Sequence, residues 1–112
     1  MPLIFSYGSL QQEAVQVSVY GRVLGGEPDE LVDWVRGEIA VPKSHKASAT
    51  LTHYANVTFA PGSGGRVAGT VFEITEAELA TTDGYEREAE YVRVIVTLAS
   101  DRRAWVYQSA GA

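Results

Sequence analysis

The stretch that decides the fold is Leu3-Ile4-Phe5-Ser6-Tyr7-Gly8-Ser9-Leu10. A short apolar run leads into a glycine turn, and Ser9 then precedes Gln12 by three residues. This order predicts a strand, a tight loop and a helix whose first turn carries a Ser9–Gln12 capping box. Backbone N–H groups at such a turn attract anions, and Gly8 leaves room for a ligand to approach. The loop is therefore either a well-capped connection or a site for a phosphate or carboxylate.

The composition is that of an ordinary small globular protein. The 112 residues fit one domain, 1–112, with 46% hydrophobic and 21% charged residues. A net charge of −5 disfavours nucleic acid as a partner. The chain has neither an apolar run of membrane-spanning length nor the pattern of a signal peptide, so we expect a cytoplasmic protein without a membrane partner. The lack of cysteine excludes disulfides and thiolate metal ligands.

Periodicity and turn residues predict six strands and two helices. The expected strands are residues 1–7, 34–41, 54–60, 66–74, 91–98 and 103–108, and residues 25–29 and 42–49 are expected to be loops. The expected helices are residues 11–20 and 75–82, ended by Gly21 and Gly84, and the second begins with a Thr75–Glu78 capping box. The glycine-rich segment 61–65 predicts a hairpin. These elements predict an α+β fold with a mixed, mainly antiparallel sheet that is curled or closed, and with two peripheral helices.

Glu86 is the strongest candidate for acid–base chemistry. It closes the segment Asp83-Gly84-Tyr85-Glu86, between the predicted end of a helix and the next strand. The carbonyl groups of a helix end and burial beside Tyr85 both disfavour the ionised carboxylate and raise its pKa toward neutrality. Such a glutamate can take up and return a proton near pH 7. A solvated surface glutamate is the alternative, and composition does not separate Glu86 from Glu88 or Glu90.

Other kinds of site have weaker support in the sequence. Ser9 lacks the Gly-x-Ser-x-Gly context of a nucleophile elbow. His45 and His53 do not have the i, i+4 spacing of a helical ligand pair, and no carboxylate cluster accompanies them. We therefore expect no metal and no cofactor.

Four segments, taken in order, resemble the gamma-glutamylcyclotransferase-like superfamily, in particular its small branch of avirulence-induced-gene-like proteins and gamma-glutamylamine cyclotransferase. They are Tyr7-Gly8-Ser9-Leu10, Gly65-Arg66-Val67-Ala68-Gly69-Thr70-Val71-Phe72, Asp83-Gly84-Tyr85-Glu86 followed by Tyr91-Val92-Arg93, and Ala104-Trp105-Val106-Tyr107.

This resemblance implies a barrel with helices packed outside it and a cavity near the glycine loop. It implies that the backbone of Tyr7, Gly8, Ser9 and Leu10 holds the α-carboxylate of a gamma-glutamyl group, and that Glu86 is the general acid and base. The implied substrate is a small gamma-glutamyl amine or related amide, which yields 5-oxoproline and an amine without metal or cofactor. The expected assembly is a monomer or a homodimer.

Arg87 departs from the family pattern, which often has glycine after the glutamate. A pair between Arg87 and Glu86 would lower the pKa of the carboxyl group and oppose catalysis. Two hypotheses follow: a cyclotransferase, and a non-catalytic module that keeps the cavity for a small carboxylate. The position of the Glu86 carboxyl group, beside the loop or beside Arg87, helps to separate them.

Overall fold

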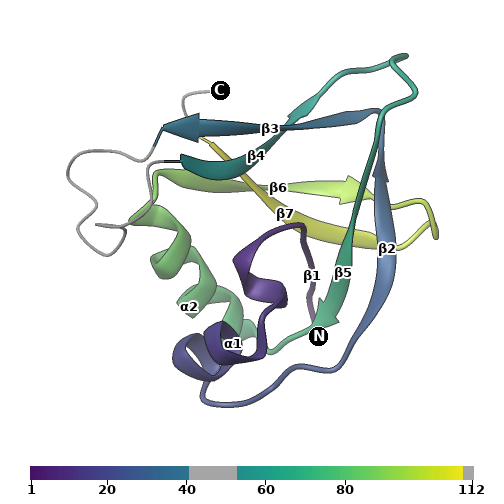
Figure 1. Ribbon diagram of the computed structural model, residues 1–112. Coiled ribbons are helices and arrows are strands. Elements are labelled where there is room, and N and C mark those ends of the chain that lie inside the picture. Colours follow the sequence, from purple (N-terminus) through teal and green to yellow (C-terminus); the bar gives the residue numbers. More distant parts are fainter. Residues whose placement is uncertain (41–52, 110–112) are drawn as a thin grey trace.

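The computed structural model describes residues 1–40 and 53–109, and the predicted loop at 42–49 lies outside them. Within the described residues the chain forms strands and helices that together confirm the α+β class (Figure 1). In chain order they are β1 (Leu3–Ser6), the 3-10 helix η1 (Ser9–Gln11), α1 (Glu13–Tyr20), β2 (Gly26–Val32), β3 (Trp34–Ala40), β4 (His53–Phe59), β5 (Arg66–Glu73), α2 (Glu76–Arg87), β6 (Tyr91–Thr97) and β7 (Arg103–Ser109).

The main sheet has five strands in the order β2-β5-β1-β7-β6. The β1–β7 pair is parallel, whereas the other pairs in this sheet are antiparallel. Strands β3 and β4 form a separate antiparallel ribbon, which crosses the top of the molecule in Figure 1. The prediction of a mixed, mainly antiparallel sheet is confirmed, while closure into a barrel stays a prediction.

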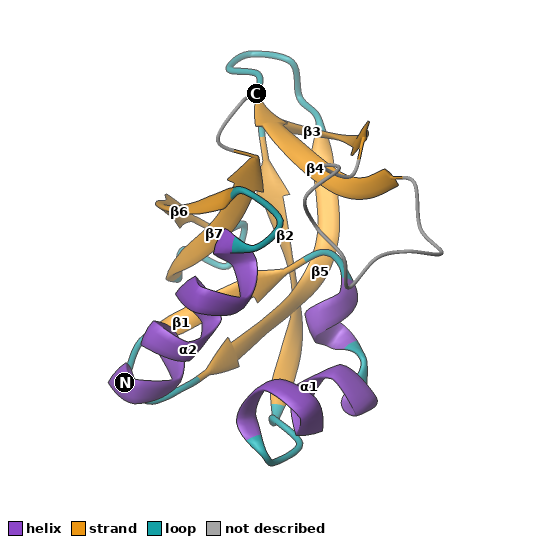
Figure 2. Cartoon of the chain, turned by 90° about the vertical axis from the view of Figure 1, so that its left-hand side faces the viewer, coloured by secondary structure: helices purple, strands orange, loops and turns teal. Residues whose placement is uncertain are grey.

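Strand β1 is central because its side chains are buried on both faces of the sheet. Ile4 belongs to a core cluster with Leu10 and Leu79, on the side of the helices. Phe5 belongs to a second cluster, which includes Trp34 from the β3–β4 ribbon. Successive side chains of a strand point to opposite faces, so a continuous apolar run suits this position. Figure 2 shows the helices and the ribbon at different ends of the strand framework. The apolar strand at the start of the chain thus lies between these two core clusters and contributes side chains to both.

The glycine at position 69 is required by close packing between β5 and β1. A Cβ atom on Gly69 would lie 2.3 Å from the carbonyl oxygen of Ser6 and 2.6 Å from the Phe5 ring. Gly65 is similar, since its Cβ atom would lie 2.5 Å from the Trp34 carbonyl oxygen. Both glycines of the Gly65–Phe72 motif therefore allow a neighbouring backbone to come close.

Two segments that were predicted to be connections have a different structure. Of residues 25–29, expected to be a loop, residues 26–29 form the first part of β2, which pairs with β5 along its length. Pro28 is tolerated there because β2 is an edge strand. The segment 61–65 joins β4 to β5 but does not form a hairpin, because β4 pairs with β3 and β5 pairs with β2 and β1.

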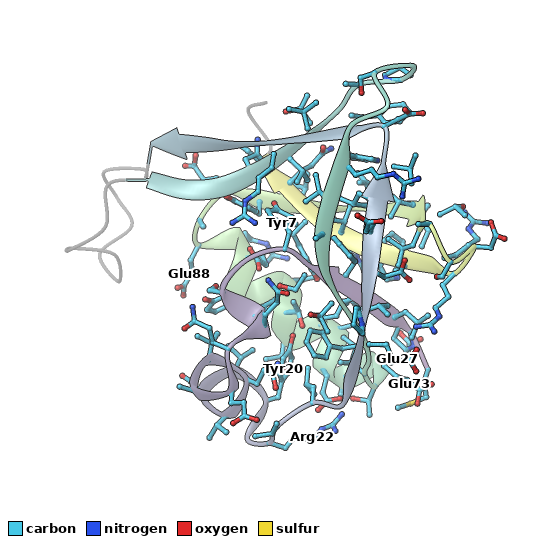
Figure 3. All side chains as sticks on the ribbon, turned by 45° about the vertical axis from the view of Figure 1, so that its right-hand side comes forward. Tyr7, Tyr20, Arg22, Glu27, Glu73 and Glu88 are labelled. Atoms are coloured by element: carbon cyan, nitrogen blue, oxygen red, sulfur yellow. The ribbon has the colours of Figure 1, made fainter. Side chains whose placement is uncertain are left out.

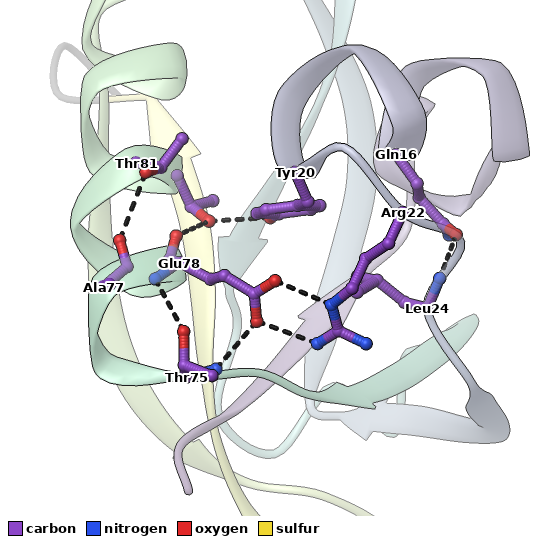
Figure 4. A network of polar contacts seen from close by, with 9 residues as sticks. Gln16, Tyr20, Arg22, Leu24, Thr75, Ala77, Glu78 and Thr81 are labelled. Carbon is purple, nitrogen blue, oxygen red and sulfur yellow. Dashed lines mark hydrogen bonds and ion pairs between the residues drawn. The ribbon is translucent and has the colours of Figure 1, made fainter.

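Helix α2 is fixed at its start by a cap and by contacts with the segment around α1 (Figure 4). The Thr75 hydroxyl accepts from the Glu78 N–H, and the Glu78 carboxylate accepts from the Thr75 N–H, which confirms the predicted capping box. Arg22 donates two hydrogen bonds of 2.8 Å to the same carboxylate. The Tyr20 hydroxyl lies 2.6 Å from the Thr82 hydroxyl.

Among the described residues, no helix combines the length and apolar character needed to cross a membrane.

Candidate active site

The glycine loop is held by its two ends, and its middle stays accessible. The Tyr7 hydroxyl is buried and donates a 2.6 Å hydrogen bond to the carbonyl oxygen of Tyr107. Leu10 is buried in the helix-side core. Between these anchors, a Cβ atom on Gly8 would meet no described atom within 4 Å, and Ser9 is exposed. The loop therefore presents backbone rather than bulky side chains to its surroundings.

The predicted capping box between Ser9 and Gln12 is wrong. Ser9 begins the 3-10 helix instead of preceding an α-helix, and the Gln12 N–H donates to the Ser9 carbonyl oxygen at 3.0 Å. Helix α1 starts at Glu13 without a side-chain cap, and it ends at Gly21, which has the predicted left-handed conformation with φ +74. The N–H groups of Ser9 and Leu10 lie in the first turn of the 3-10 helix, where a helix offers its own backbone no acceptor.

The Ser9 side chain instead contacts α2. Its hydroxyl lies 3.3 Å from the hydroxyl of Tyr85, which comes from the last turn of that helix. This contact joins two segments that are 76 positions apart in the sequence. The predicted loop and the predicted acid–base segment are therefore neighbours, and Tyr85 is a contact residue that the sequence analysis missed.

Glu86 lies inside the last turn of α2, not beyond its end as predicted. Gly84 does not cap the helix, which continues to Arg87 and is followed by a turn in which Glu90 adopts φ +63. The Ala89 N–H donates to the Glu86 carbonyl oxygen at 3.0 Å. Glu86 is thus positioned by a helix that is anchored at both its start and its middle.

Burial raises the pKa of the partly buried Glu86 carboxyl group to about 7. Burial also raises the pKa values of Tyr7, Tyr20 and Tyr107, and the negative charge of Glu86 raises each of them further. The carboxylate therefore acts on hydroxyl groups from the glycine loop, α1 and β7. Figure 3 labels Tyr7, from the glycine loop, and Tyr20, from α1.

A pair between Arg87 and Glu86, which would oppose catalysis, is absent among the described residues. Arg87 is exposed, and no ion pair there involves either side chain. Since burial raises the pKa of Glu86 without an opposing cation, the concern that Arg87 neutralises it is not supported.

A polar chain that begins at Asp83, one helical turn before Glu86, connects α2 to the sheet. The Tyr107 hydroxyl donates a 2.7 Å hydrogen bond to Asp83 Oδ1, and Arg93 Nε lies 3.5 Å from the same oxygen. The Tyr107 carbonyl oxygen in turn accepts from the Tyr7 hydroxyl. Asp83, Arg93 and Tyr107 belong to the sequence motifs that resemble the family, but no role was predicted for them. In the observed helix Asp83 and Glu86 share a face because they are three residues apart, but the predicted helix end at Gly84 hid this relation in the sequence.

A surface hollow of about 540 Å³ lies elsewhere, at the start of β1. Its lining residues are Leu3, Gly25, Gly26, Glu27, Val71, Glu73 and Arg102. Arg102 already forms an ion pair with Glu27. Figure 3 shows Glu27 and Glu73 together and away from Tyr7, so this hollow is separate from the candidate site.

Comparisons with solved structures show the same fold. A structure described as gamma-glutamyl cyclotransferase superposes with a TM-score of 0.76 at 19% identity, covering 96% of this chain and 66% of that one. Solution structures of two Arabidopsis thaliana proteins give TM-scores of 0.73 and 0.74, each at 23% identity. They cover 98% and 97% of this chain, which spans 62% and 68% of their lengths. At such identities the likeness shows the fold alone.

The sequence itself gives the family. No curated protein matches it significantly. A model of the family described as gamma-glutamyl cyclotransferase, AIG2-like, matches residues 4–111. This match includes the glycine loop and Glu86, and it confirms the resemblance seen in the four sequence segments. The chain therefore belongs to the gamma-glutamyl cyclotransferase, AIG2-like family.

Proposed function

We propose that the protein is an enzyme that converts a gamma-glutamyl amine or related amide into 5-oxoproline and a free amine, with Glu86 as general acid and base. One observation carries this proposal: the glycine loop contacts the helix turn that bears a partly buried glutamate with a pKa of about 7. A carboxyl group with this pKa is divided between its two protonation states at neutral pH.

The proposed role of Tyr7, Gly8, Ser9 and Leu10 is to bind the α-carboxylate of the glutamyl group through their backbone. The open space beside Gly8 supports this role, because a carboxylate can approach the backbone there. The first-turn N–H groups of Ser9 and Leu10 are suitable donors for an anion. Binding at this end directs the rest of the substrate toward the Glu86 turn.

The proposed reaction needs only one proton shuttle. Glu86 takes a proton from the α-ammonium group of the substrate, and the freed nitrogen attacks the γ-carbonyl carbon of the same molecule. A new C–N bond closes the five-membered ring, while the bond to the leaving nitrogen breaks. Protonated Glu86 then returns its proton to the departing amine, and the ring nitrogen releases its second proton to solvent, so the enzyme ends in its starting state.

The pKa values and the expected contributions to the rate are consistent with a site that has a single catalytic side chain. A free α-amino group has a pKa of about 8, so a base with a pKa near 7 is closely matched to it. Correct orientation of an intramolecular attack lowers a barrier by roughly 7–11 kcal/mol. General acid–base catalysis adds about 10²- to 10⁴-fold. Folding the substrate correctly therefore contributes more than the proton transfer.

The proposal extends to the context of the enzyme. We infer a small-molecule gamma-glutamyl substrate, no metal or cofactor, a closed barrel, a cytoplasmic location, and a monomer or homodimer.

The experiment is a mass-spectrometric screen of gamma-glutamyl amines and amides for release of 5-oxoproline. The wild-type protein is compared with Glu86→Gln and with the matched control Glu88→Gln, two residues further along and exposed. We expect release by the wild type and by the control, and a loss of about 10²-fold or more in Glu86→Gln. Equal turnover by all three proteins overturns the role of Glu86. If none of them releases 5-oxoproline although the wild type binds the substrates, the protein is a binding module.

A further inference from the structure

Helix α1 buries a polar side chain rather than an apolar one. Gln16 is 2% exposed and is the one buried residue of α1, a helix that the structure describes in full. Val15 and Val19 are only partly buried. An amide that leaves water loses its hydrogen bonds to water, so its burial reduces stability unless protein groups replace these bonds. The burial of Gln16 is therefore explained by the groups to which its amide binds.

Both polar atoms of the Gln16 side chain bind backbone groups. Nε2 donates a hydrogen bond of 2.9 Å to the carbonyl oxygen of Leu10, and Oε1 accepts one of 2.8 Å from the N–H group of Leu24 (Figure 4 shows the second bond). A carbonyl group only accepts and an N–H group only donates, so these two partners fix the orientation of the amide. Leu10 ends the glycine loop, residues 7–10, and Leu24 lies between α1 and β2. Gln16 thus holds the end of the loop against the segment that follows α1.

The bond to Leu10 reaches the rest of the loop through consecutive peptide groups. The peptide group with the Leu10 carbonyl also contains the Gln11 N–H, which donates to the Gly8 carbonyl oxygen at 3.1 Å. The peptide group with the Gly8 carbonyl contains the Ser9 N–H. In a trans peptide group the C=O and N–H bonds point in opposite directions, so the Ser9 N–H points away from Gln11. The Leu10 N–H is directed in the same way, since the Ser9 carbonyl oxygen accepts from the Gln12 N–H at 3.0 Å.

We propose that Gln16 is a positioning residue that fixes the peptide groups of the glycine loop, so that the Ser9 and Leu10 N–H groups point toward the α-carboxylate of the substrate. The inference rests on the proposed function, which supplies the carboxylate that these N–H groups bind. Gln16 does not itself touch the substrate, because its amide is buried and both polar atoms are used by backbone groups. An apolar side chain of the same size would fill its place but would leave the Leu10 peptide group free to turn.

A second glutamine supports the same loop from the side of the sheet. Gln11 Nε2 donates to the Gly8 carbonyl oxygen at 3.3 Å, and Gln11 Oε1 accepts from the Thr70 hydroxyl of β5 at 2.9 Å. Gln11 is exposed, so water can replace its amide, whereas Gln16 is buried. The loop is therefore expected to depend on Gln16 more than on Gln11.

The main variant is Gln16→Met, and its matched control is Asn56→Leu. Asn56 is also a buried amide, 5% exposed, and its Oδ1 accepts from the Ser109 N–H at 2.9 Å, which joins β4 to β7. Each substitution replaces an amide by an apolar side chain of similar size and removes a buried hydrogen bond. Both variants are therefore expected to be less stable than the wild type. Only Gln16→Met is expected to change the glycine loop.

Gln16→Glu separates the hydrogen bond to the loop from the packing of the side chain. A protonated carboxyl group donates to the Leu10 carbonyl and accepts from the Leu24 N–H, whereas an ionised carboxylate cannot donate. We compare the KM of this variant with that of the wild type at the same pH, which removes effects common to both proteins. This KM ratio is expected to be near one at about pH 5 and to rise to roughly tenfold at about pH 9.

Two measurements report on the loop. Amide hydrogen exchange followed by NMR reads the Gln11 N–H, whose bond to Gly8 depends on the orientation of the Leu10 peptide group. Steady-state kinetics use a gamma-glutamyl compound from which the wild type releases 5-oxoproline. In Gln16→Met we expect faster exchange at Gln11 and a higher KM, each by roughly tenfold, the effect of one hydrogen bond. The value of kcat stays close to that of the wild type, because Gln16 acts on binding and not on proton transfer. Asn56→Leu is expected to change neither quantity.

A folded Gln16→Met protein with wild-type exchange at Gln11 and a wild-type KM overturns the proposal, as does an equal rise of KM in Asn56→Leu. If Gln16→Met does not fold, Gln16→Glu decides, and a KM ratio that does not rise with pH overturns the proposal. Hydrogen exchange needs no turnover. If the wild type releases no 5-oxoproline, the proposed function fails, whereas faster exchange at Gln11 in Gln16→Met still supports the positioning of the loop by Gln16.

Discussion

The hydroxyl of Ser9 lies 3.3 Å from the hydroxyl of Tyr85, although these residues are 76 positions apart in the chain. This contact joins the first turn after β1 to the last turn of α2, next to Glu86. An anion-binding loop and a proton-transfer group can serve one substrate only if they are neighbours. The contact therefore supports a single site composed of both segments.

Removal of the Tyr85 hydroxyl tests whether this contact orders the site. We expect Tyr85→Phe to raise KM roughly two- to tenfold, the range of a single neutral hydrogen bond, with little change in stability because both groups are exposed. Steady-state kinetics of Tyr85→Phe, Ser9→Ala and the double variant measure the effect. If the contact orders the site, the KM of the double variant is no higher than that of the more impaired single variant. Fully additive effects on KM argue against such a role.

Gly8→Ala tests the approach of the substrate to the loop. The new methyl group meets no described atom within 4 Å, so the fold is expected to remain stable. The same methyl group occupies the open space beside the backbone, so we expect KM to rise by about tenfold or more. Thermal unfolding and kinetics are measured on the same sample. Unchanged KM in a folded Gly8→Ala protein excludes this space from the binding site.

Thr75→Ala tests the anchoring of α2. Loss of the capping hydroxyl is expected to reduce the free energy of unfolding by about 1 kcal/mol. Thr81→Ala is the matched control, because Thr81 is exposed within the same helix and bonds only to the backbone of Ala77. Urea unfolding monitored by circular dichroism gives both values. Equal destabilisation by the two changes is incompatible with a special role of the cap.

Glu86 also makes stability depend on pH. Its pKa is about 7 in the folded protein and near 4.5 in an unfolded chain, so its contribution to stability is present below pH 4.5 and is lost as the pH rises through 7. The difference between these two pKa values corresponds to roughly 3 kcal/mol.

We therefore expect Glu86→Gln to gain stability relative to the wild type between about pH 4 and pH 8, by an amount of this order. Urea unfolding at a series of pH values measures the gain, with Glu88→Gln as the control. A constant difference between Glu86→Gln and the wild type over this range contradicts the raised pKa.

The sequence predicted the elements whose local signals agree with the tertiary structure. The alternation over residues 91–98 predicted β6, and Thr75 and Glu78 predicted the start of α2. Rules based on local sequence failed where contacts with residues distant in the sequence determine the secondary structure. Pro28 suggested a loop, yet it lies in an edge strand where its missing N–H group has no cost. Gly84 suggested a helix end, yet the packed helix continues past it.

The candidate site was likewise predicted only in part from the sequence. The glycine loop and Glu86 were predicted as candidates from sequence, partly through the family resemblance. Their contact through Tyr85 was not predictable, because the chain between them forms most of the sheet. The Asp83–Arg93 pair was equally hidden, since its partners come from different elements.

The central claim is that Glu86 transfers the proton during ring closure. The most direct test is the pH dependence of kcat/KM, measured with a gamma-glutamyl compound from which the protein releases 5-oxoproline. We predict that kcat/KM of the wild type rises about tenfold per pH unit below a pKa near 7 and then levels off, and that residual activity in Glu86→Gln lacks this limb. A wild-type profile without a limb near pH 7, or a Glu86→Gln profile that retains it, would contradict the account.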